Sequence, residues 1–381
     1  MYANEGVEML QQFSVKGFRN FKEWYHFNLK TEKNYEFNTD SIENEIVKNS
    51  MIYGHNGCGK SNLGLAILDL TCHINDIPTM HSLSFNYLNG YLDKDDFAEF
   101  KYVFNFDKEV VTYSYGKSSA DKIIYENLKI NDNVVVNFDR RVSSEMEVNL
   151  RGTETLNRDI SDSPISAIKY IKSNALLDSE DINASLFKRF IEFVSGMVFF
   201  RTLTQNADYY GQQLDRNRLS KAIIDANKVK DFESFLNEAG VDCKLSTTGV
   251  ANEERIVFQY NDSTIDFAIA ASTGTMSLGI FYYWWLKLEA GKLTFAYIDE
   301  FDAYYHFSLS KLVVKRLIDV KCQTVLTTHN LSIMSNDLLR PDCYFIMADK
   351  QYPFYKLVDK ELRKAHNLEK IYKGLKYESK E

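Results

Sequence analysis

Proline and cysteine are scarce in this sequence. Only 4 of the 381 residues are proline, and no tract is dominated by one residue type, so long disordered linkers are not expected. The five cysteines are scattered along the chain and form no C-x-x-C pair. Neither a disulfide framework nor a zinc knuckle is therefore supported, and a reducing cytoplasm is the expected location.

Long apolar runs and a basic excess are also missing. No window reaches 18 apolar residues, and the N-terminus has no apolar core of the signal-peptide type, so we expect no membrane partner. The net charge of -8 gives no global attraction to nucleic acid. Residues 350–381 nevertheless hold nine Lys or Arg against five Asp or Glu, which keeps a nucleic acid open as a local contact.

A complete glycine-rich phosphate-loop motif is present. Residues 54–61 spell GHNGCGKS between a predicted strand and a predicted helix, and such loops point backbone N–H groups at phosphate oxygens. Lys60 is expected to reach the β- and γ-phosphates of ATP, and the Ser61 hydroxyl to ligate Mg²⁺. We interpret His55 and Cys58 as fillers at variable positions and not as a redox or metal site. The expected nucleotide-binding residues are Gly54, His55, Asn56, Gly57, Cys58, Gly59, Lys60, Ser61 and Asn62.

An acidic pair follows a later apolar run. Residues 293–298 (LTFAYI) lead into Asp299 and Glu300. Beside a phosphate loop, a carboxylate at the tip of a central strand is the second protein contact of the metal, which we assign to Asp299. Glu300 is then placed to orient or deprotonate the attacking water. Taken alone, an apolar strand ending in Asp-Glu is also an ordinary exit into a loop.

Two further segments are candidates for the same site. His329 follows a short apolar strand, in Thr327-Thr328-His329-Asn330, where it would sense the γ-phosphate, although a lone His is usually structural. Ser272 and Gly274, in Ser272-Thr273-Gly274-Thr275, precede a predicted helix. They form either an ordinary N-cap or an anion site, and the phosphate there need not belong to the same subunit.

The hydrophobic pattern predicts an α/β fold with an insertion. Period-two alternation over 97–148 predicts an antiparallel β lobe, whereas 163–240 has helical spacing with a stop at Gly240. The helical stripe consists of Phe187, Phe190, Ile191, Val194 and Val198. The other predicted elements are two strands in 9–29 with a turn near Arg19–Asn20, a strand at 50–53, a helix at 63–70, a strand-like segment at 256–270, helices at 275–287 and 309–320, and strands at 293–298 and 324–327.

These elements predict three regions. The strand–helix–strand order of the last part fits a parallel sheet, and the 239 positions from Lys60 to Asp299 exceed what one βαβ unit needs. We predict that 1–160 form the first half of an ATPase head together with the β lobe. Residues 161–242 are predicted to be a helical insertion, and 243–381 the second half of the head with a short basic tail.

Taken together, the motifs resemble the ABC-type ATPase heads of the RecF, SMC and OLD group, and most of all the bacterial AAA-named, ABC-like ATPases of antiphage and abortive-infection systems. The opening FSVKGFRNFKEWYHFNL resembles the first strands of that group. YGHNGCGKSN resembles its Walker A with Asn62, STGT stands where its signature stands, YIDEFDAYYH resembles its Walker B and D-loop, and LTTHN its His switch. The tail segments RPDCYFIM and ELRKAHNLEKIYKGL also look like small ATPases of this kind.

The resemblance implies an ABC-ATPase-like P-loop head that assembles as a homodimer or higher homo-oligomer. Ser272 and Gly274 would contact the γ-phosphate of a partner's ATP in a self-complementary sandwich. The signature departs from the transporter form, being STGT and not SGGQ, and Gln205 is only a weak candidate for the Q-loop glutamine. The 52 residues after His329 are too few for the TOPRIM nuclease of OLD proteins, so an effector nuclease or toxin is expected on a separate polypeptide.

Three functions remain open from the sequence. The first is a sensor-switch ATPase of an antiphage defence system that controls a separate effector, with ATP and Mg²⁺ as ligands. The second is a RecF-like DNA-repair ATPase that clamps DNA on ATP-driven dimerisation, against which the acidic net charge counts. The third is a transporter-associated ATPase, which needs a membrane partner.

Overall fold

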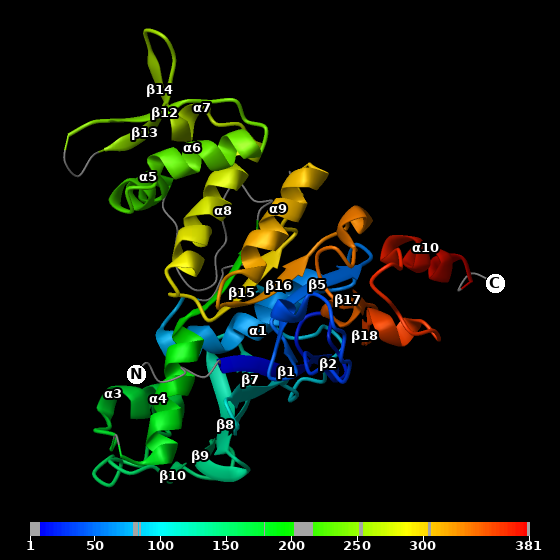
Figure 1. Cartoon of the computed structure of the whole chain (residues 1–381). Helices are drawn as coiled ribbons and strands as arrows, with labels where there is room; N and C mark the ends of the chain where they lie inside the picture. The colour runs from blue at the N-terminus through cyan, green and yellow to red at the C-terminus, as the bar shows by residue number, and fades with distance from the viewer. Residues whose placement is uncertain are drawn as a thin grey trace.

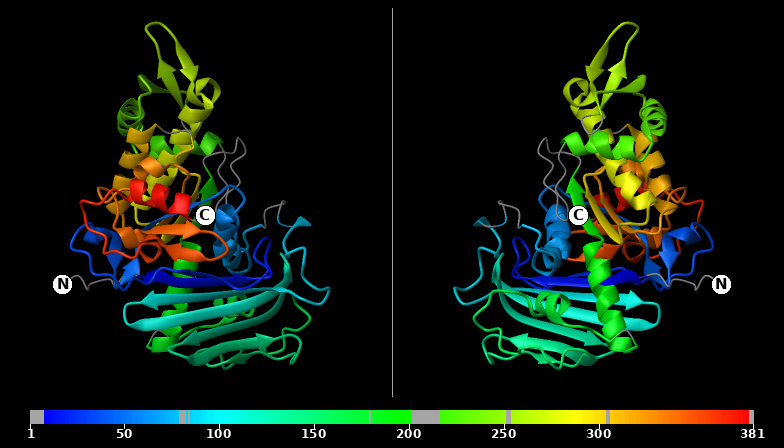
Figure 2. Two further views of the ribbon diagram at one scale, coloured as in Figure 1. Left: turned by 90° about the vertical axis from the view of Figure 1, so that its right-hand side faces the viewer. Right: turned by 90° about the vertical axis from the view of Figure 1, so that its left-hand side faces the viewer.

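A long helix lies between two large β-sheets (Figures 1 and 2). The computed structural model describes residues 8–78, 83, 85–178, 180–201, 216–250, 254–303 and 306–378. The helix, α1 (Lys60–Asn75), begins at the end of the glycine-rich loop. It separates an antiparallel sheet from a largely parallel one, so the middle of the molecule is a β–α–β sandwich.

The antiparallel sheet has seven strands in the order β10-β9-β8-β7-β6-β1-β2. The predicted β lobe and the two predicted N-terminal strands therefore join in one sheet, because β1 pairs with β6. In β6 nearly every second residue is buried, as expected for a sheet that covers a core with one face. The strands are β1 (Glu8–Lys16), β2 (Tyr25–Asn28), β6 (Ala98–Phe106), β7 (Glu109–Ser119), β8 (Lys122–Ile130), β9 (Asn133–Asp139) and β10 (Glu147–Val148).

The second sheet has the order β11-β15-β16-β5-β17-β18, and β18 alone runs antiparallel to its neighbour. Its inner strands are buried on both faces, which explains their short continuous apolar runs. The strands are β5 (Asn49–Gly54), β11 (Met197–Arg201), β15 (Phe295–Asp299), β16 (Gln323–Thr327), β17 (Tyr344–Met347) and β18 (Gln351–Pro353).

Helix α1 contacts both sheets. On one side, Gly64 allows the rings of Tyr297 and Phe199 in the parallel sheet to approach the helix backbone closely. On the other side, the Tyr102 hydroxyl of the antiparallel sheet donates to the Ala66 carbonyl at 2.9 Å. Because both faces of α1 are covered, packing holds the start of the helix at the carboxyl ends of the parallel strands.

Two helices cover the outer face of the parallel sheet and lead to a smaller lobe. They are α8 (Thr273–Glu289) and α9 (Phe307–Ile318), and Trp284 of α8 stacks on Phe200 of β11. The small lobe lies at the top of Figure 1. It contains α5 (Arg216–Asp225), α6 (Val229–Glu238), α7 (Phe267–Ala270), β12 (Leu245–Thr248), β13 (Arg255–Gln259) and β14 (Thr264–Asp266).

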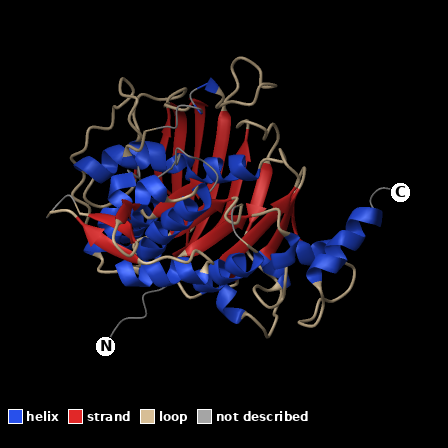
Figure 3. Ribbon diagram, turned by 90° about the horizontal axis from the view of Figure 1, so that it is seen from above, coloured by secondary structure: helices blue, strands red, loops and turns tan. Residues whose placement is uncertain are grey.

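The remaining elements lie at the periphery. Helices α3 (Ala167–Asn174) and α4 (Ile182–Ser195) accompany the antiparallel sheet, whereas α10 (Leu368–Glu378) extends to one side near the C-terminus (Figures 1 and 3). Strands β3 (Ile42–Glu43) and β4 (Ile46–Val47) form a hairpin. None of the helices within the described ranges has the length and apolarity that crossing a bilayer requires.

The predicted α/β architecture is confirmed, with three local differences. Val198 does not continue the helical stripe of α4, because Gly196 ends that helix and Val198 lies in β11. Residues 161–242 are therefore not helical throughout, since β11 pairs with β15 in the central sheet. The strand-like segment 256–270 divides into β13, β14 and the short helix α7, which Asp266 caps.

Candidate functional site

The phosphate loop connects β5 to α1 and contains two residues with left-handed backbone. Gly57 has φ of 78° and Gly59 has φ of 105°, a region that costs other residues steric strain. A Cβ on Gly59 would also lie 2.4 Å from the amide nitrogen of Asn20. The backbone angle therefore favours glycine at position 59, and a larger residue would also displace the Asn20 side chain.

Lys60 folds back over its own loop. Its Nζ donates to the carbonyl oxygens of Gly54 and His55, both at 3.0 Å, and the residue is only 6% exposed. These bonds hold the ammonium group above the loop, at the N-terminus of α1, where partial positive charge favours an anion. The arrangement suits a phosphate-binding cradle.

Asp299 lies at the end of β15 and links the two predicted halves of the site. Its Oδ2 accepts from the Ser61 hydroxyl at 2.7 Å, and its Oδ1 accepts from the Thr327 hydroxyl at 2.8 Å. Tyr297, two residues earlier, donates to the Lys60 carbonyl at 2.6 Å. Folding thus brings the Walker A end and the acidic strand end together despite the long intervening segment.

Glu300 has an unusual backbone conformation. Its φ is 49°, and its N–H donates to the Thr327 hydroxyl at 2.7 Å. A non-glycine residue in this region carries a cost of roughly 1–3 kcal/mol. Burial, and next the neighbouring Asp299, raise the pKa of the Glu300 carboxyl, whereas Arg201 and Lys60 oppose the rise.

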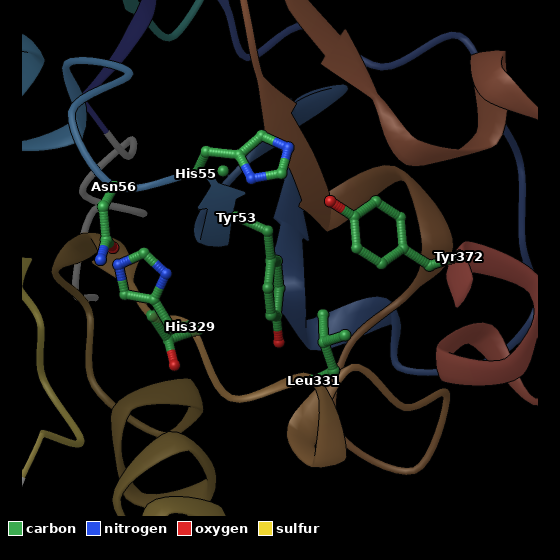
Figure 4. A pocket seen from close by; sticks show the side chains of 8 residues that line it. Tyr53, His55, Asn56, His329, Leu331 and Tyr372 are labelled. Atoms are coloured by element: carbon green, nitrogen blue, oxygen red, sulfur yellow. The ribbon is translucent and has the colours of Figure 1, made fainter. Parts of the chain in front are cut away.

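His329 lines a cavity of about 480 Å³ beside the phosphate loop. In Figure 4 the imidazole of His329 lies next to Asn56, and the hydroxyl of Tyr372 points toward His55. The neighbouring Thr328 hydroxyl donates to Asp302 at 2.7 Å, which fixes the start of this segment. The position of His329 is therefore at the loop, as predicted, and its catalytic role stays a prediction.

A second cavity, of about 600 Å³, also adjoins the loop. Its walls come from the segment that leads from β1 into β2, from the loop itself and from the end of β17 with the turn after it: Asn20, Phe21, Lys22, Glu23, Trp24, Tyr25, His55, Asn56, Gly57, Cys58, Met347, Ala348 and Asp349. The Asn62 amide, next to the loop, donates to the Asn20 side chain at 2.6 Å. The predicted residue Asn62 is thus a link between the loop and this wall.

Ser272 and Gly274 lie at the start of α8. Ser272 is the N-cap, because its hydroxyl accepts from the Thr275 N–H at 3.2 Å. Within the described part of the chain, no hydrogen bond or ion pair connects either residue to the phosphate loop. The geometry matches the N-cap expectation, and the contact with a partner's nucleotide stays a prediction. Gln205 lies outside the described residues.

Sequence reasoning missed Arg201. Its Nε donates to Asp299 Oδ2 at 2.7 Å, and the two residues are register partners on adjacent parallel strands. The signal was available, since Arg201 is the polar residue that ends the apolar run Met197–Phe200. The helical interpretation of this stretch concealed it.

The residues fit a Mg²⁺–nucleotide. Mg²⁺ prefers hard oxygen ligands, and the Ser61 hydroxyl and the buried Asp299 carboxylate supply them 2.7 Å apart at the edge of the loop. Asp299 is only 1% exposed in its side chain, so its charge is held away from bulk water. The Lys60 ammonium and the glycine-rich backbone supply the groups that phosphates require.

Comparison with known proteins identifies a family for this chain. The model of the AAA_21 family, described as "AAA domain, putative AbiEii toxin, Type IV TA system", matches residues 50–335. No curated protein matches the chain.

Several solved ATPase heads are similar over nearly the whole chain. The head domain of Smc with an extended coiled coil, bound to the C-terminal domain of ScpA and derived from Pyrococcus furiosus, has 14% identity. The match covers 98% of the present chain and 100% of the Smc head chain, with a TM-score of 0.47. The SMC head domain from Thermotoga maritima has 14% identity and a TM-score of 0.41, and the match covers 90% of the present chain and 97% of the SMC head chain. The recombination mediator RecF with ATP has 14% identity, coverage of 91% and 98%, and a TM-score of 0.42. Because the family match spans well over half of the sequence, the protein belongs to this AAA-domain family of ATPases.

Proposed function

We propose that the protein is an ATP-hydrolysing switch in which ATP binding joins two copies and hydrolysis separates them. The observation that carries this proposal is the 2.7 Å contact between Ser61 and Asp299. It unites a phosphate loop with an acidic strand end that also carries Glu300. In this assignment, Lys60 binds the β- and γ-phosphates, Ser61 and Asp299 hold Mg²⁺, and Mg²⁺ neutralises phosphate charge when bound.

Glu300 is the proposed general base. Its raised pKa moves its proton affinity toward neutral pH, which favours proton transfer from water. His329, at the wall of the adjoining cavity, is proposed to hydrogen-bond the γ-phosphate. The ATPase assignment is tested by measuring ATP hydrolysis by the wild-type protein and by Lys60→Ala. No hydrolysis and no ATP binding by the wild type would refute it.

The larger cavity is the proposed site of the base. It adjoins the loop and contains Trp24, which is 41% exposed, together with Phe21 and Lys22. An exposed indole offers a face for stacking on a purine. Its volume of about 600 Å³ lies in the range of small-molecule sites.

The exposed start of α8 supports the sandwich. Ser272 is exposed and lies at the N-terminus of α8, where partial positive charge favours an anion. We propose that Ser272 and Gly274 approach the γ-phosphate bound by a second copy, in a two-fold arrangement that places two nucleotides between the subunits.

We further propose that the switch belongs to an antiphage, abortive-infection-like system and controls a separate nuclease or toxin. The family description, which names a putative toxin of a toxin–antitoxin system, supports this context. The test combines purification of the native complex with phage challenge of cells that carry the gene and its neighbours. If no partner accompanies the protein and phage yield is unchanged with wild type and Lys60→Ala alike, the defence role is refuted.

A RecF-like DNA clamp is the second candidate. Exposed basic residues on and before α10, among them Arg363, Lys364 and Lys370, favour it. This function requires ATP-dependent retention of duplex DNA that weakens steeply as salt rises. Equal DNA retention with and without ATP at low salt would remove it from consideration.

A further inference from the structure

We propose that Arg201 makes divalent-cation binding at Asp299 depend on bound nucleotide. The inference rests on the proposed ATPase function and adds a positioning residue to it. Arg201 is not assigned any contact with the reacting atoms. Its proposed action is to occupy the metal-binding carboxylate until the phosphates supply enough negative charge for a second cation.

The contact is built into the fold. Arg201 ends β11 and Asp299 ends β15, and the parallel register pairs them directly. The Arg201 Nε lies 2.7 Å from Asp299 Oδ2, which also accepts the Ser61 hydroxyl at 2.7 Å. The guanidinium carbon also lies 5.9 Å from the centroid of the Phe199 ring, which helps to fix its orientation.

The Arg201 guanidinium and a divalent cation would therefore compete for the same atom, Asp299 Oδ2. Asp299 Oδ2 already bonds both Ser61 and Arg201, and Oδ1 bonds Thr327. A divalent cation held by Ser61 and Asp299 would approach Oδ2, where the guanidinium lies. Two cations that contact the same oxygen lie close together, so the guanidinium and the divalent cation would repel each other strongly in this partly buried site.

The local charges make the competition asymmetric. Three carboxylates, Asp299, Glu300 and Asp302, lie with two cations, Lys60 and Arg201, so their formal charges leave a single negative charge. A divalent cation alone would give the site a positive excess, whereas a cation accompanied by triphosphate would not. Arg201 consequently opposes the bare cation more than the cation with nucleotide, which is a positive coupling between the two ligands.

Arg201→Met removes the charge and keeps much of the apolar length of the side chain. Arg201→Lys keeps the charge. Arg189→Met is the matched control, because Arg189 also donates its Nε to a carboxylate, Glu8, at 2.6 Å. Arg189 has 29% side-chain exposure against 30% for Arg201, and it likewise packs against a phenylalanine, Phe106.

The measurement is the MgCl₂ midpoint, which is the MgCl₂ concentration that gives half of the maximal rise in melting temperature. It is measured with and without the non-hydrolysable ATP analogue AMP-PNP. Without nucleotide, the MgCl₂ midpoint of Arg201→Met should be about fivefold lower than that of the wild type. The ratio of the midpoints without and with AMP-PNP, which measures the coupling, should fall by a similar factor. Arg201→Lys and Arg189→Met should keep the wild-type midpoint, although Arg189→Met loses stability. The gain of Arg201→Met should vanish when Asp299→Asn is added.

An unchanged MgCl₂ midpoint in Arg201→Met would overturn the proposal. If that variant does not fold, the wild type still decides, because a MgCl₂ midpoint that is equal with and without AMP-PNP would also overturn it. If the wild type binds AMP-PNP and these tests still fail, only the proposed role of Arg201 is contradicted, and the ATPase function is not. Wild-type protein that does not bind AMP-PNP at all contradicts the ATPase function.

Discussion

Lys60 is preorganised for an anion by the loop that carries it. Its ammonium group bonds two loop carbonyls at 3.0 Å, so little side-chain entropy is lost when a phosphate binds. Lys60→Ala should weaken ATP binding by about 10- to 100-fold, as expected for loss of a charge-assisted bond of roughly 1.5–3 kcal/mol. Equilibrium binding of a fluorescent ATP analogue measures this change. Lys370→Ala, at an exposed lysine of α10, is the control and should bind normally.

Glu300→Gln should bind ATP normally and hydrolyse it slowly. The substitution removes the proposed base and keeps the size of the side chain, so kcat should fall by roughly 10²- to 10⁴-fold. Single-turnover hydrolysis measures the chemical step directly. Hydrolysis at the parental rate would show that Glu300 is not the base.

The pH profile tests the same residue independently. Because burial raises the pKa of Glu300 above its ordinary value, the base is lost by protonation as pH falls through that raised pKa. The acid limb of the kcat/KM profile, which reports the protein without nucleotide, should therefore lie above the usual range of glutamate, and activity should be full at higher pH. An acid limb at the ordinary glutamate value would contradict this assignment.

The residues of the loop and of the acidic pair could be predicted because their chemistry requires a fixed local spacing. Gly57, Gly59 and Lys60 belong to one motif, and Asp299 follows a recognisable apolar strand. The polar residue Arg201 could be noticed at the end of its apolar run, but its pairing with Asp299 could not be predicted, since the two residues lie 98 positions apart in sequence. Periodicity within one segment carries no information on which strand lies beside it.

Among the elements, α1 depends on a close approach to the parallel sheet. A Cβ at Gly64 would lie 2.5 Å from the Tyr297 ring and 2.7 Å from the Phe199 ring, so Gly64→Ala should cost about 1–3 kcal/mol of stability. Denaturant unfolding measures this cost. Gly374→Ala in α10 is the matched control, because a Cβ there meets nothing within 4 Å. The control should stabilise the protein by up to about 1 kcal/mol through helix propensity.

A buried ion pair fixes the other face of α1. The Lys117 ammonium of β7 lies 2.7 Å from Asp69 of α1, both side chains being 1% exposed, and Tyr87 and Tyr115 also donate to Asp69. Lys117→Met should destabilise the protein by about 3–5 kcal/mol, because it leaves a buried carboxylate without its cation. Lys373→Met removes the exposed partner of Glu369 and should change stability by less than about 1 kcal/mol. Equal losses in the two variants would contradict this account.

The types of most elements could be predicted from periodicity, whereas their partners could not. The alternation in 97–148 predicted antiparallel strands, but nothing local indicated that β1 would pair with β6. The stretch from Met197 is apolar on both faces, and a short run of this kind does not distinguish a strand from the end of a helix. The central sheet decided its structure through pairing with β15.

In the molecule as a whole, the chain leaves the site after β5 and α1 and returns through β11, β15 and β16. The antiparallel sheet and the small lobe occupy opposite sides of the parallel sheet (Figure 2). The boundaries at 160 and 242 stay a prediction, although β11, which lies between them in sequence, belongs to the central sheet. Sequence could give the order of the motifs but not the position of the small lobe.

At this scale, ATP should change the mass of the assembly. With Mg²⁺-ATP, Glu300→Gln should form a stable dimer or larger oligomer, because the bound nucleotide is not consumed and bridges two copies. Mass measurement in solution with and without ATP detects this. Adding Ser272→Arg, which places a bulky cation at the start of α8, should prevent assembly and leave ATP binding intact. Assembly that does not respond to ATP in Glu300→Gln would contradict the sandwich.

The central claim is that the two distant segments at 60–61 and 299–300 form one Mg²⁺-ATP site. A double-mutant cycle on Mg²⁺-ATP affinity, with Ser61→Ala, Asp299→Asn and their combination, tests it most directly. If both residues act through the same metal, the double variant should bind little worse than the weaker single variant. Losses that add fully would mean that Ser61 and Asp299 act independently, and the account would be wrong.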